Sequence, residues 1–306
     1  MRSLLASLMI VAVVAPMPAN AWSRPGHMVA AAIAYDELMR DDPAVVAEML
    51  RLLAAHPDPG PFQVAIDRTE GAERDGRLFL EMARWPDDVR GGPDDHPTWH
   101  YRLYVVGKDD GIITKGSGVE ALALNLSVAR DPRAPAADRA VALCWILHVV
   151  ADLHQPLHSA ERVAPDWPQG DEGGSKVFVR YSVSGKPVSL HWFWDDSVSR
   201  DGSAAAAFAR ARDLEVRFPR ARFAEALLHP VAAPDASERW LAESYALAVS
   251  VAYRADAPHA TSAATARPAA PGYTEAVAQV SEQRVALAGY RLADLLRTVF
   301  AARPAN

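Results

Sequence analysis

The sequence has a single cysteine, Cys144, among its 306 residues. One cysteine cannot form an intrachain disulfide, and a single thiol excludes a zinc site built from several thiolates. Cys144 lies in an apolar run, where we expect a small buried hydrophobic residue rather than a reactive thiol. Any metal in this protein must therefore be held by histidine, carboxylate and backbone ligands. Histidine combined with carboxylate suits zinc.

The sequence also lacks an excess of positive charge. Its 32 Lys and Arg residues against 38 Asp and Glu residues give a formal net charge of −6. This balance argues against a protein that holds nucleic acid through a broad basic surface. A phosphate-binding protein of this composition needs a local source of positive charge, which bound cations can supply.

Long apolar runs are missing after the N-terminus, where no segment is long enough to span a membrane. Residues 1–21 are typical of an export signal, with Arg2, an apolar run over residues 4–14 and Ala19-Asn20-Ala21. The alternative is an uncleaved anchor. We expect cleavage after Ala21, so that the mature protein begins at Trp22 and is periplasmic or secreted, without a membrane anchor.

Helical patterns dominate the rest of the chain, and no alternating series of strands and helices is present. We therefore predict one all-α domain over residues 22–306, with a small β-hairpin at residues 175–190 around Gly185-Lys186. Residues 255–272, rich in Ala, Pro and Thr, are predicted to form a mobile loop. The expected helices cover residues 28–39, 43–53, 69–83, 119–129, 136–150, 238–253 and 274–301.

Polar residues interrupt the apolar helix that ends near residue 152. His148 and Asp152 are four residues apart, so they share one face of this helix and can bind the same ion. His158 lies roughly 240° further round the helix, at about 100° per residue, and Pro156 disturbs the backbone before it. We therefore expect His158 to serve a different ion. The alternative for each residue is a hydrogen-bonded core position.

A second pair with the same spacing is His191 and Asp195. With these two pairs and the motifs given below, the sequence resembles a known family, the S1/P1 nucleases, which are zinc-dependent enzymes with a three-zinc site. The resemblance follows the family's order along almost the whole chain after residue 21. The matching pieces are Trp22 with Gly26-His27, Trp85-Pro86-Asp87, His100-Tyr101, His148-x3-Asp152-x5-His158, Gly173-Gly174, Leu190-His191-x3-Asp195 and Gly289-Tyr290-Arg291-Leu292-Ala293.

This resemblance implies a mostly helical domain of the phospholipase C/P1 nuclease type and three Zn²⁺ ions. It also implies how nine ligands would be shared among them. The sets are Asp87, His100, His148 and Asp152 for one ion; Trp22, through its free amine and carbonyl, with His27 and Asp152 for the second; and His158, His191 and Asp195 for the third. Because histidines bind as neutral ligands, three divalent ions outweigh the charge of the aspartates. The site would thus attract phosphate within an acidic protein.

The resemblance further implies hydrolysis of single-stranded DNA and RNA to 5′-phosphate products, with possible 3′-nucleotidase action. Paired zinc ions lower the pKa of a bound water molecule, and we expect Asp87 to orient or deprotonate this water. Arg90 matches a family arginine and would stabilise the transition state, unless it is an ordinary salt-bridge residue. Tyr101 falls where the family has an aromatic residue that stacks on a base, unless it packs in the core.

Two other functions fit parts of the pattern. A zinc phospholipase C shares the fold and the trinuclear site. Two features favour the nuclease: His27 lies only five residues after Trp22, and the last ligand is Asp195, where the phospholipases resemble each other in using Glu. A non-catalytic periplasmic zinc-binding protein would not need Arg90 or the mixed ligand set. We expect a monomer that acts on single-stranded nucleic acid or nucleotides and has no stable protein partner.

The remaining histidines are predicted to lie outside the metal site. His154 faces away from His148 and is expected to have a structural role or to hold a ligand in place. The other four lie in loops or proline-rich turns, where we expect solvated side chains: His56, His96, His229 and His259.

Overall fold

The structure is a computed structural model that describes residues 22–107 and 113–301. The predicted export signal, residues 1–21, lies outside this range. Within it the chain forms eleven α-helices, which confirms the all-α prediction. Their bounds are α1 Arg24–Asp41, α2 Pro43–Leu53, α3 Gly60–Arg68, α4 Gly71–Asp88, α5 Gly118–Arg130, α6 Ala136–Asp152, α7 Leu190–Asp195, α8 Ala204–Arg217, α9 Ala224–Leu227, α10 Ala236–Leu247 and α11 Pro271–Phe300.

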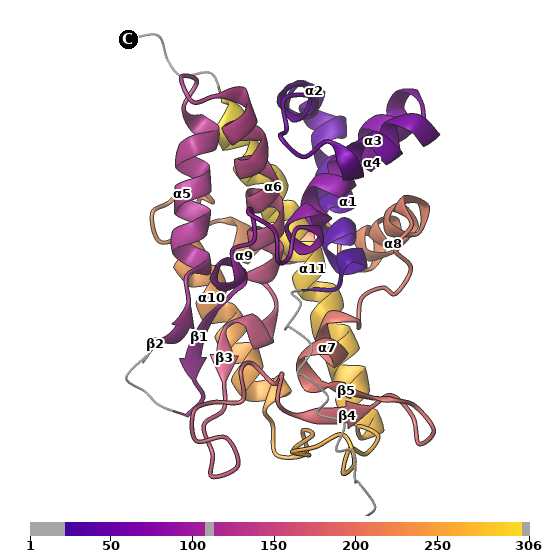
Figure 1. Cartoon of the computed structure of the whole chain (residues 1–306), viewed down its shortest axis with the longest axis vertical. Helices are drawn as coiled ribbons and strands as arrows, with labels where there is room; N and C mark the ends of the chain where they lie inside the picture. Colours follow the sequence, from indigo (N-terminus) through magenta and orange to yellow (C-terminus); the bar gives the residue numbers. More distant parts are fainter. Residues whose placement is uncertain (1–21, 108–112, 302–306) are drawn as a thin grey trace, which may run out of the picture.

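Helices α1, α6 and α11 form the centre of the molecule (Figure 1). α1 is buried on nearly all sides because small alanines let α4, α8 and α11 approach closely. α11 meets α1 at Gly289, where an added Cβ would lie 2.6 Å from Cβ of Ile33 and 2.8 Å from the carbonyl oxygen of Ala30. This contact requires glycine and sets the distance between the two helices. α6 packs against α2, α4 and α5, so its polar residues point into the interior.

The predicted hairpin is present as β4 (Phe178–Arg180) and β5 (Pro187–Ser189), which pair antiparallel. The chain also forms a second sheet, with strand order β2-β1-β3. The aromatic, β-prone sequence of residues 99–106 predicts its strand β1, but the two partner strands were not predicted. In it, β1 (Arg102–Val105) pairs antiparallel with β2 (Ile113–Gly116) and parallel with β3 (Ala160–Glu161). The parallel pair brings the segment after His100 beside the segment after His158.

Three local features differ from the predicted elements. Helix α3 was not predicted, and α4 continues through Pro86 to Asp88 instead of stopping near residue 83. Residues 255–272 contain no helix before α11, but they are tied to β4 by backbone hydrogen bonds. The amide of Phe178 donates to Ala260 O (2.8 Å) and that of Arg180 donates to Arg267 O (3.0 Å).

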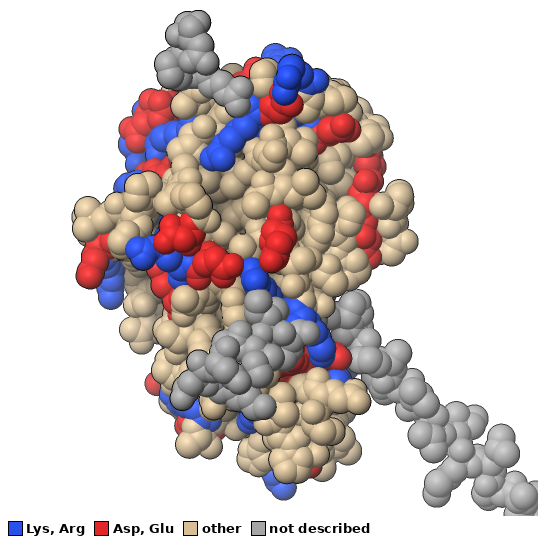
Figure 2. Space-filling view, turned by 90° about the vertical axis from the view of Figure 1, so that its left-hand side faces the viewer, with Lys and Arg blue, Asp and Glu red and all other residues tan. Residues whose placement is uncertain are grey.

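The described surface has no extended basic face in the view of Figure 2, where Lys and Arg alternate with Asp and Glu across largely uncharged surface. This distribution agrees with the net charge of −6. Among the described helices, none is both long enough and apolar enough to cross a bilayer.

Candidate metal centre

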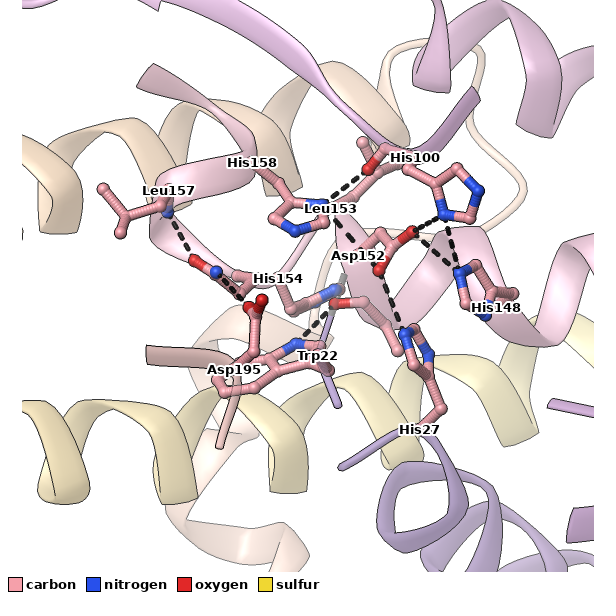
Figure 3. Close-up of polar contacts among 12 residues, drawn as sticks. Trp22, His27, His100, His148, Asp152, Leu153, His154, Leu157, His158 and Asp195 are labelled. Atoms are coloured by element: carbon pink, nitrogen blue, oxygen red, sulfur yellow. Dashed lines mark hydrogen bonds and ion pairs between the residues drawn. The ribbon is translucent and has the colours of Figure 1, made fainter. Parts of the chain in front are cut away.

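Asp152, at the end of α6, lies at the centre of a cluster of buried histidines (Figure 3). Its Oδ2 is 3.2 Å from Nε2 of His148, one helical turn earlier, as the four-residue spacing predicted. The same oxygen is 3.2 Å from Nδ1 of His100, and these two histidine nitrogens are 2.9 Å apart. His100, His148 and Asp152 therefore present ligand atoms to one point.

Two residues from other helices extend this group. His27, in α1, places Nε2 3.3 Å from Oδ1 of Asp152, and its ring stacks on His148 with 3.7 Å between ring centroids. Asp87, in the last turn of α4, places Oδ1 4.0 Å from Nε2 of His148. One ligand atom from each of His27, Asp87 and His148 falls within a common 4.8 Å. The two oxygens of Asp152 thus face different histidines.

A further group forms beyond the end of α6. Nε2 of His158 is 3.1 Å from Nε2 of His191, which is 3.5 Å from Oδ2 of Asp195. His191 and Asp195 lie one turn apart on α7, and His158 closes the short 3-10 helix Pro156–His158. The prediction that His158 serves a different group from His148 agrees with this geometry.

Backbone carbonyls fix the tautomers of three of these histidines. Nδ1 of His148 donates to Ala83 O (2.9 Å), Nδ1 of His158 to His100 O (2.6 Å) and Nδ1 of His191 to Gly173 O (2.7 Å). A carbonyl oxygen can only accept, so in each neutral ring Nδ1 carries the proton and Nε2 carries the lone pair. That lone pair faces the cluster, as a metal ligand requires.

Trp22 is fully buried, although its predicted role is that of a terminal ligand. Its indole Nε1 donates to Ala151 O (2.9 Å), one residue before Asp152. The amide of the next residue, Ser23, donates to Asp195 O (3.2 Å). These contacts fix the start of the described chain between Asp152 and Asp195.

Gln155 is a site residue that the sequence analysis missed. Its amide Nε2 donates to Oδ1 of Asp195 (2.7 Å), and its Oε1 accepts from the backbone amide of Leu157. Gln155 therefore orients the Asp195 carboxylate and leaves Oδ2 toward His191. Its only sequence signal was its position between His154 and Pro156.

Gly173 holds His191 through a backbone conformation that favours glycine. Its φ is +60°, and an added Cβ would lie 2.4 Å from Leu157 O and 3.3 Å from Nδ1 of His191. We expect Gly173→Ala to cost about 1–3 kcal/mol in stability and to weaken zinc binding at the third group, as measured by melting temperature and zinc content.

Gly91→Ala is the matched control for this prediction. Gly91 has a φ of +78°, but an added Cβ there would meet no atom within 4 Å. It therefore reports backbone strain alone, and zinc content should not change. Equal zinc loss in both variants would contradict the role given to Gly173.

The cluster fits divalent cations by its chemistry. Several of its buried nitrogen and oxygen atoms have no hydrogen-bond partner among the described residues, which is costly unless an ion satisfies them. These atoms are Nδ1 and Nε2 of His27, Oδ2 of Asp87, Nε2 of His100, Oδ1 of Asp152 and Oδ2 of Asp195. Histidine nitrogens combined with carboxylate oxygens form a donor set that suits zinc.

Burial also sets the protonation of the cluster. It lowers the pKa of His27, His100 and His158 well below the usual value, with further lowering from neighbouring histidines and Arg90. These rings are therefore neutral near pH 7 and ready to bind a cation. Burial raises the pKa of Asp152 to about 7, against the opposing effect of His148.

Arg90 and Tyr101 are placed as follows. Nε and Nη2 of Arg90 donate to Oδ1 of Asp87 (3.1 and 2.8 Å), so Arg90 touches the cluster directly. Tyr101 directly follows His100 and is partly exposed. Burial raises the pKa of its hydroxyl, with added effects from Glu172 and Glu161.

The other histidines lie outside the three groups. His154 donates through Nδ1 to Val150 O (2.7 Å), and its Nε2 accepts from Arg291 (2.9 Å), which fits the structural role predicted for it. His229 and His259 are exposed, and His96 is half-buried against Trp99. The prediction of a solvated His56 is wrong. Its ring is buried edge-on against Trp85 and accepts the amide of Asp58 (3.1 Å).

The sequence of the chain is similar to those of known proteins. A family model described as S1/P1 Nuclease matches residues 22–301. Endonuclease 4 of Arabidopsis thaliana is 26% identical over 174 residues, which cover 53% of this chain and 52% of that protein. The chain thus spans about half the length of this curated relative. Because the family model covers most of the sequence, the chain belongs to the S1/P1 nuclease family, and this membership indicates a hydrolase that cleaves phosphodiester bonds.

Proposed function

We propose that this protein is an exported, zinc-dependent nuclease that hydrolyses single-stranded DNA and RNA to 5′-phosphate products, with 3′-nucleotidase activity. The observation that carries the proposal is the convergence of buried histidine and aspartate ligands from α1, α4, α6 and α7, whose ligand atoms form groups within 4.8 Å of one another. A non-catalytic zinc store has no need of an arginine that contacts this cluster.

Three zinc ions would be held by the ligand sets that the family resemblance implies. The contacts of Asp152 with His27 and with the His100/His148 pair support its role as a shared ligand. Such ions, when bound, lower the pKa of water and neutralise charge on phosphate oxygens. Asp87 would orient the attacking water or hold its proton, because its Oδ2 has no partner within the described structure.

Arg90 would stabilise the charge that develops on the phosphate oxygens, and Tyr101 would stack on a base. The Arg90 side chain keeps 19% of its surface exposed and contacts Asp87, so a substrate at the cluster can reach it. Its fork of N–H donors matches two phosphate oxygens.

Arg90→Ala should lower kcat by about a hundredfold and leave zinc content unchanged. Arg84→Ala is the matched control, because Arg84 lies in α4, six residues before Arg90, and pairs with Asp88 (2.8 Å) instead of a candidate ligand. Steady-state kinetics and metal analysis of both variants test the prediction. Unchanged turnover in Arg90→Ala would remove this residue from the mechanism.

Export, with a mature chain that begins at Trp22, is proposed from the sequence pattern of residues 1–21. We also propose that the mature protein is a monomer without a membrane anchor. These proposals are tested by N-terminal sequencing of the exported protein and by its mass in solution. A retained N-terminal segment would overturn the first, and a stable dimer the second.

The activity itself is tested by metal analysis of the processed protein with nuclease assays before and after chelation. We expect about three zinc ions per chain, cleavage of single-stranded DNA and RNA, loss of activity with a chelator and recovery on adding zinc. Hydrolysis of phosphatidylcholine in place of nucleic acid would overturn the proposal. So would stoichiometric zinc without any phosphodiesterase activity.

A further inference from the structure

A pocket of about 210 Å³ borders the metal cluster between the start of α1 and the end of α7. Its walls include Arg24, Asp87, Trp192, Asp196 and Arg200. Neither the family resemblance nor the function proposed above uses any of these except Asp87. The pocket therefore needs an explanation of its own.

Most of the residues that line the pocket are candidate ligands of the cluster or lie close to one in the sequence. Asp87 belongs to both, and Trp192 and Asp196 each directly follow a candidate ligand of α7. Arg24 is two residues from Trp22, and its Nη2 donates to the backbone carbonyl of Asp87 (3.4 Å). When a phosphodiester binds at the cluster, one of the two groups attached to its phosphate would therefore lie next to this pocket.

The charges of the pocket are balanced, so it is not a simple phosphate site. Nε of Arg24 is 2.6 Å from Oδ1 of Asp88, and Nε of Arg200 is 2.6 Å from Oδ2 of Asp196. The guanidinium of Arg200 also stacks on the Tyr181 ring at 4.0 Å. Pairing through Nε fixes each guanidinium and leaves outer N–H groups for other partners.

The walls thus combine an aromatic ring with fixed hydrogen-bond donors and a carboxylate acceptor. An aromatic ring next to balanced donors and acceptors suits a nucleobase and its sugar better than a bare anion. Trp192 is only partly buried, so its ring can offer surface to a ligand.

We propose that this pocket binds the nucleoside next to the scissile phosphate, with the base stacked on Trp192 and hydrogen-bonded by Arg24, Asp196 or Arg200. The proposal rests on the nuclease function proposed above and narrows its substrate class. The protein selects phosphodiesters that carry a nucleoside on the pocket side, and the base contributes to KM.

The test compares Trp192→Ala, Trp192→Phe and Arg200→Ala with wild type, all zinc-loaded and of equal zinc content. Arg239→Ala is the matched control, because Arg239 also pairs with an aspartate four residues earlier (3.3 Å) and lines a different pocket. Three substrates are used: a thymidine dinucleotide and two analogues of it, each of which lacks the base on a different one of the two sugars.

We expect Trp192→Ala to raise KM for the intact dinucleotide about tenfold, with Trp192→Phe close to wild type and Arg200→Ala intermediate. The effect of Trp192→Ala should vanish on one of the two abasic analogues, because the base that stacks on Trp192 is missing there. A merely structural role for Trp192 would raise KM for all three substrates alike, and that result would overturn the proposal. So would an unchanged KM in Trp192→Ala.

A binding measurement tests the pocket independently of the nuclease activity. If zinc-loaded wild type cleaves neither the dinucleotides nor single-stranded DNA or RNA, the nuclease proposal fails. Calorimetry with an uncleavable methylphosphonate dinucleotide then tests the pocket alone. Weaker binding by Trp192→Ala than by Arg239→Ala would support the pocket, and equal binding by the two would overturn it.

Discussion

Replacing Asp152 with asparagine should remove at least one zinc ion and lower kcat/KM roughly a thousandfold or more, equivalent to about 4 kcal/mol of transition-state stabilisation. Asp152 is fully buried, and its two oxygens face different histidines, with Oδ1 3.3 Å from His27 and Oδ2 3.2 Å from His148. Asparagine keeps the shape but has no charge and only one acceptor oxygen. At least one histidine group would therefore lose its shared carboxylate.

Zinc stoichiometry and kinetics on a single-stranded oligonucleotide measure this effect. Glu37→Gln is the control, because Glu37 is also a buried carboxylate but pairs with Arg40 (2.6 Å) and Arg220 (3.2 Å) away from the cluster. It should keep its zinc and its activity. An Asp152→Asn protein with full zinc and normal turnover would show that Asp152 is not a shared ligand.

Once the metal is removed, the same variant should become more stable relative to wild type as the pH rises. Burial raises the pKa of Asp152 to about 7 in the fold, above its unfolded value of 3.8. The folded state thus holds the proton more tightly, and stability falls as pH rises between these two values. Metal-free Asp152→Asn lacks this loss, so its melting temperature relative to metal-free wild type should rise from about pH 5 to about pH 8. A constant difference across this range would contradict the raised pKa.

The sequence predicted the parts of the site that helical spacing determines. The pairs His148/Asp152 and His191/Asp195 each lie one turn apart, so the periodicity of a helix was enough to group them. The six-residue step and Pro156 predicted a different group for His158. Its Nε2 is 3.1 Å from Nε2 of His191, but its Nδ1 is also 3.8 Å from Oδ1 of Asp152. The approach of His27 and Asp87 from other helices came only from the family resemblance, since periodicity within a helix carries no information on contacts between helices.

Other features of the site and fold could not be predicted from the residue types. Gly173 O and Ala83 O orient histidines, but every residue has a carbonyl, and the fold alone decides which one is near. The partners of β1, the strands β2 and β3, were not predicted because they have only two to four residues and the parallel pair joins segments far apart in sequence. His56 was wrongly predicted to be solvated because its proline-rich loop packs against Trp85.

The chain that keeps residues before Trp22 should bind one zinc ion fewer and lose at least about a hundredfold in activity. In the chain that begins at Trp22, the terminal amine has a pKa near 8 and can lose its proton to a metal ion. When Ala21 precedes it, the same nitrogen is an amide and a poor ligand. The buried indole and the bond from Ser23 to Asp195 O hold this nitrogen in place, so it cannot be replaced by an amine one residue away.

A fusion with a protease site directly before Trp22 allows the same polypeptide to be measured before and after cleavage. Cleavage should add one zinc ion per chain and restore activity together. A second protein cleaved to begin at Ala21 is the control, because it also has a free amine but in the wrong place, and it should behave like the uncleaved form. If the uncleaved fusion already holds full zinc and cleaves nucleic acid normally, the terminal amine is not a ligand. An ion bound by His27 and Asp152 would then need another ligand.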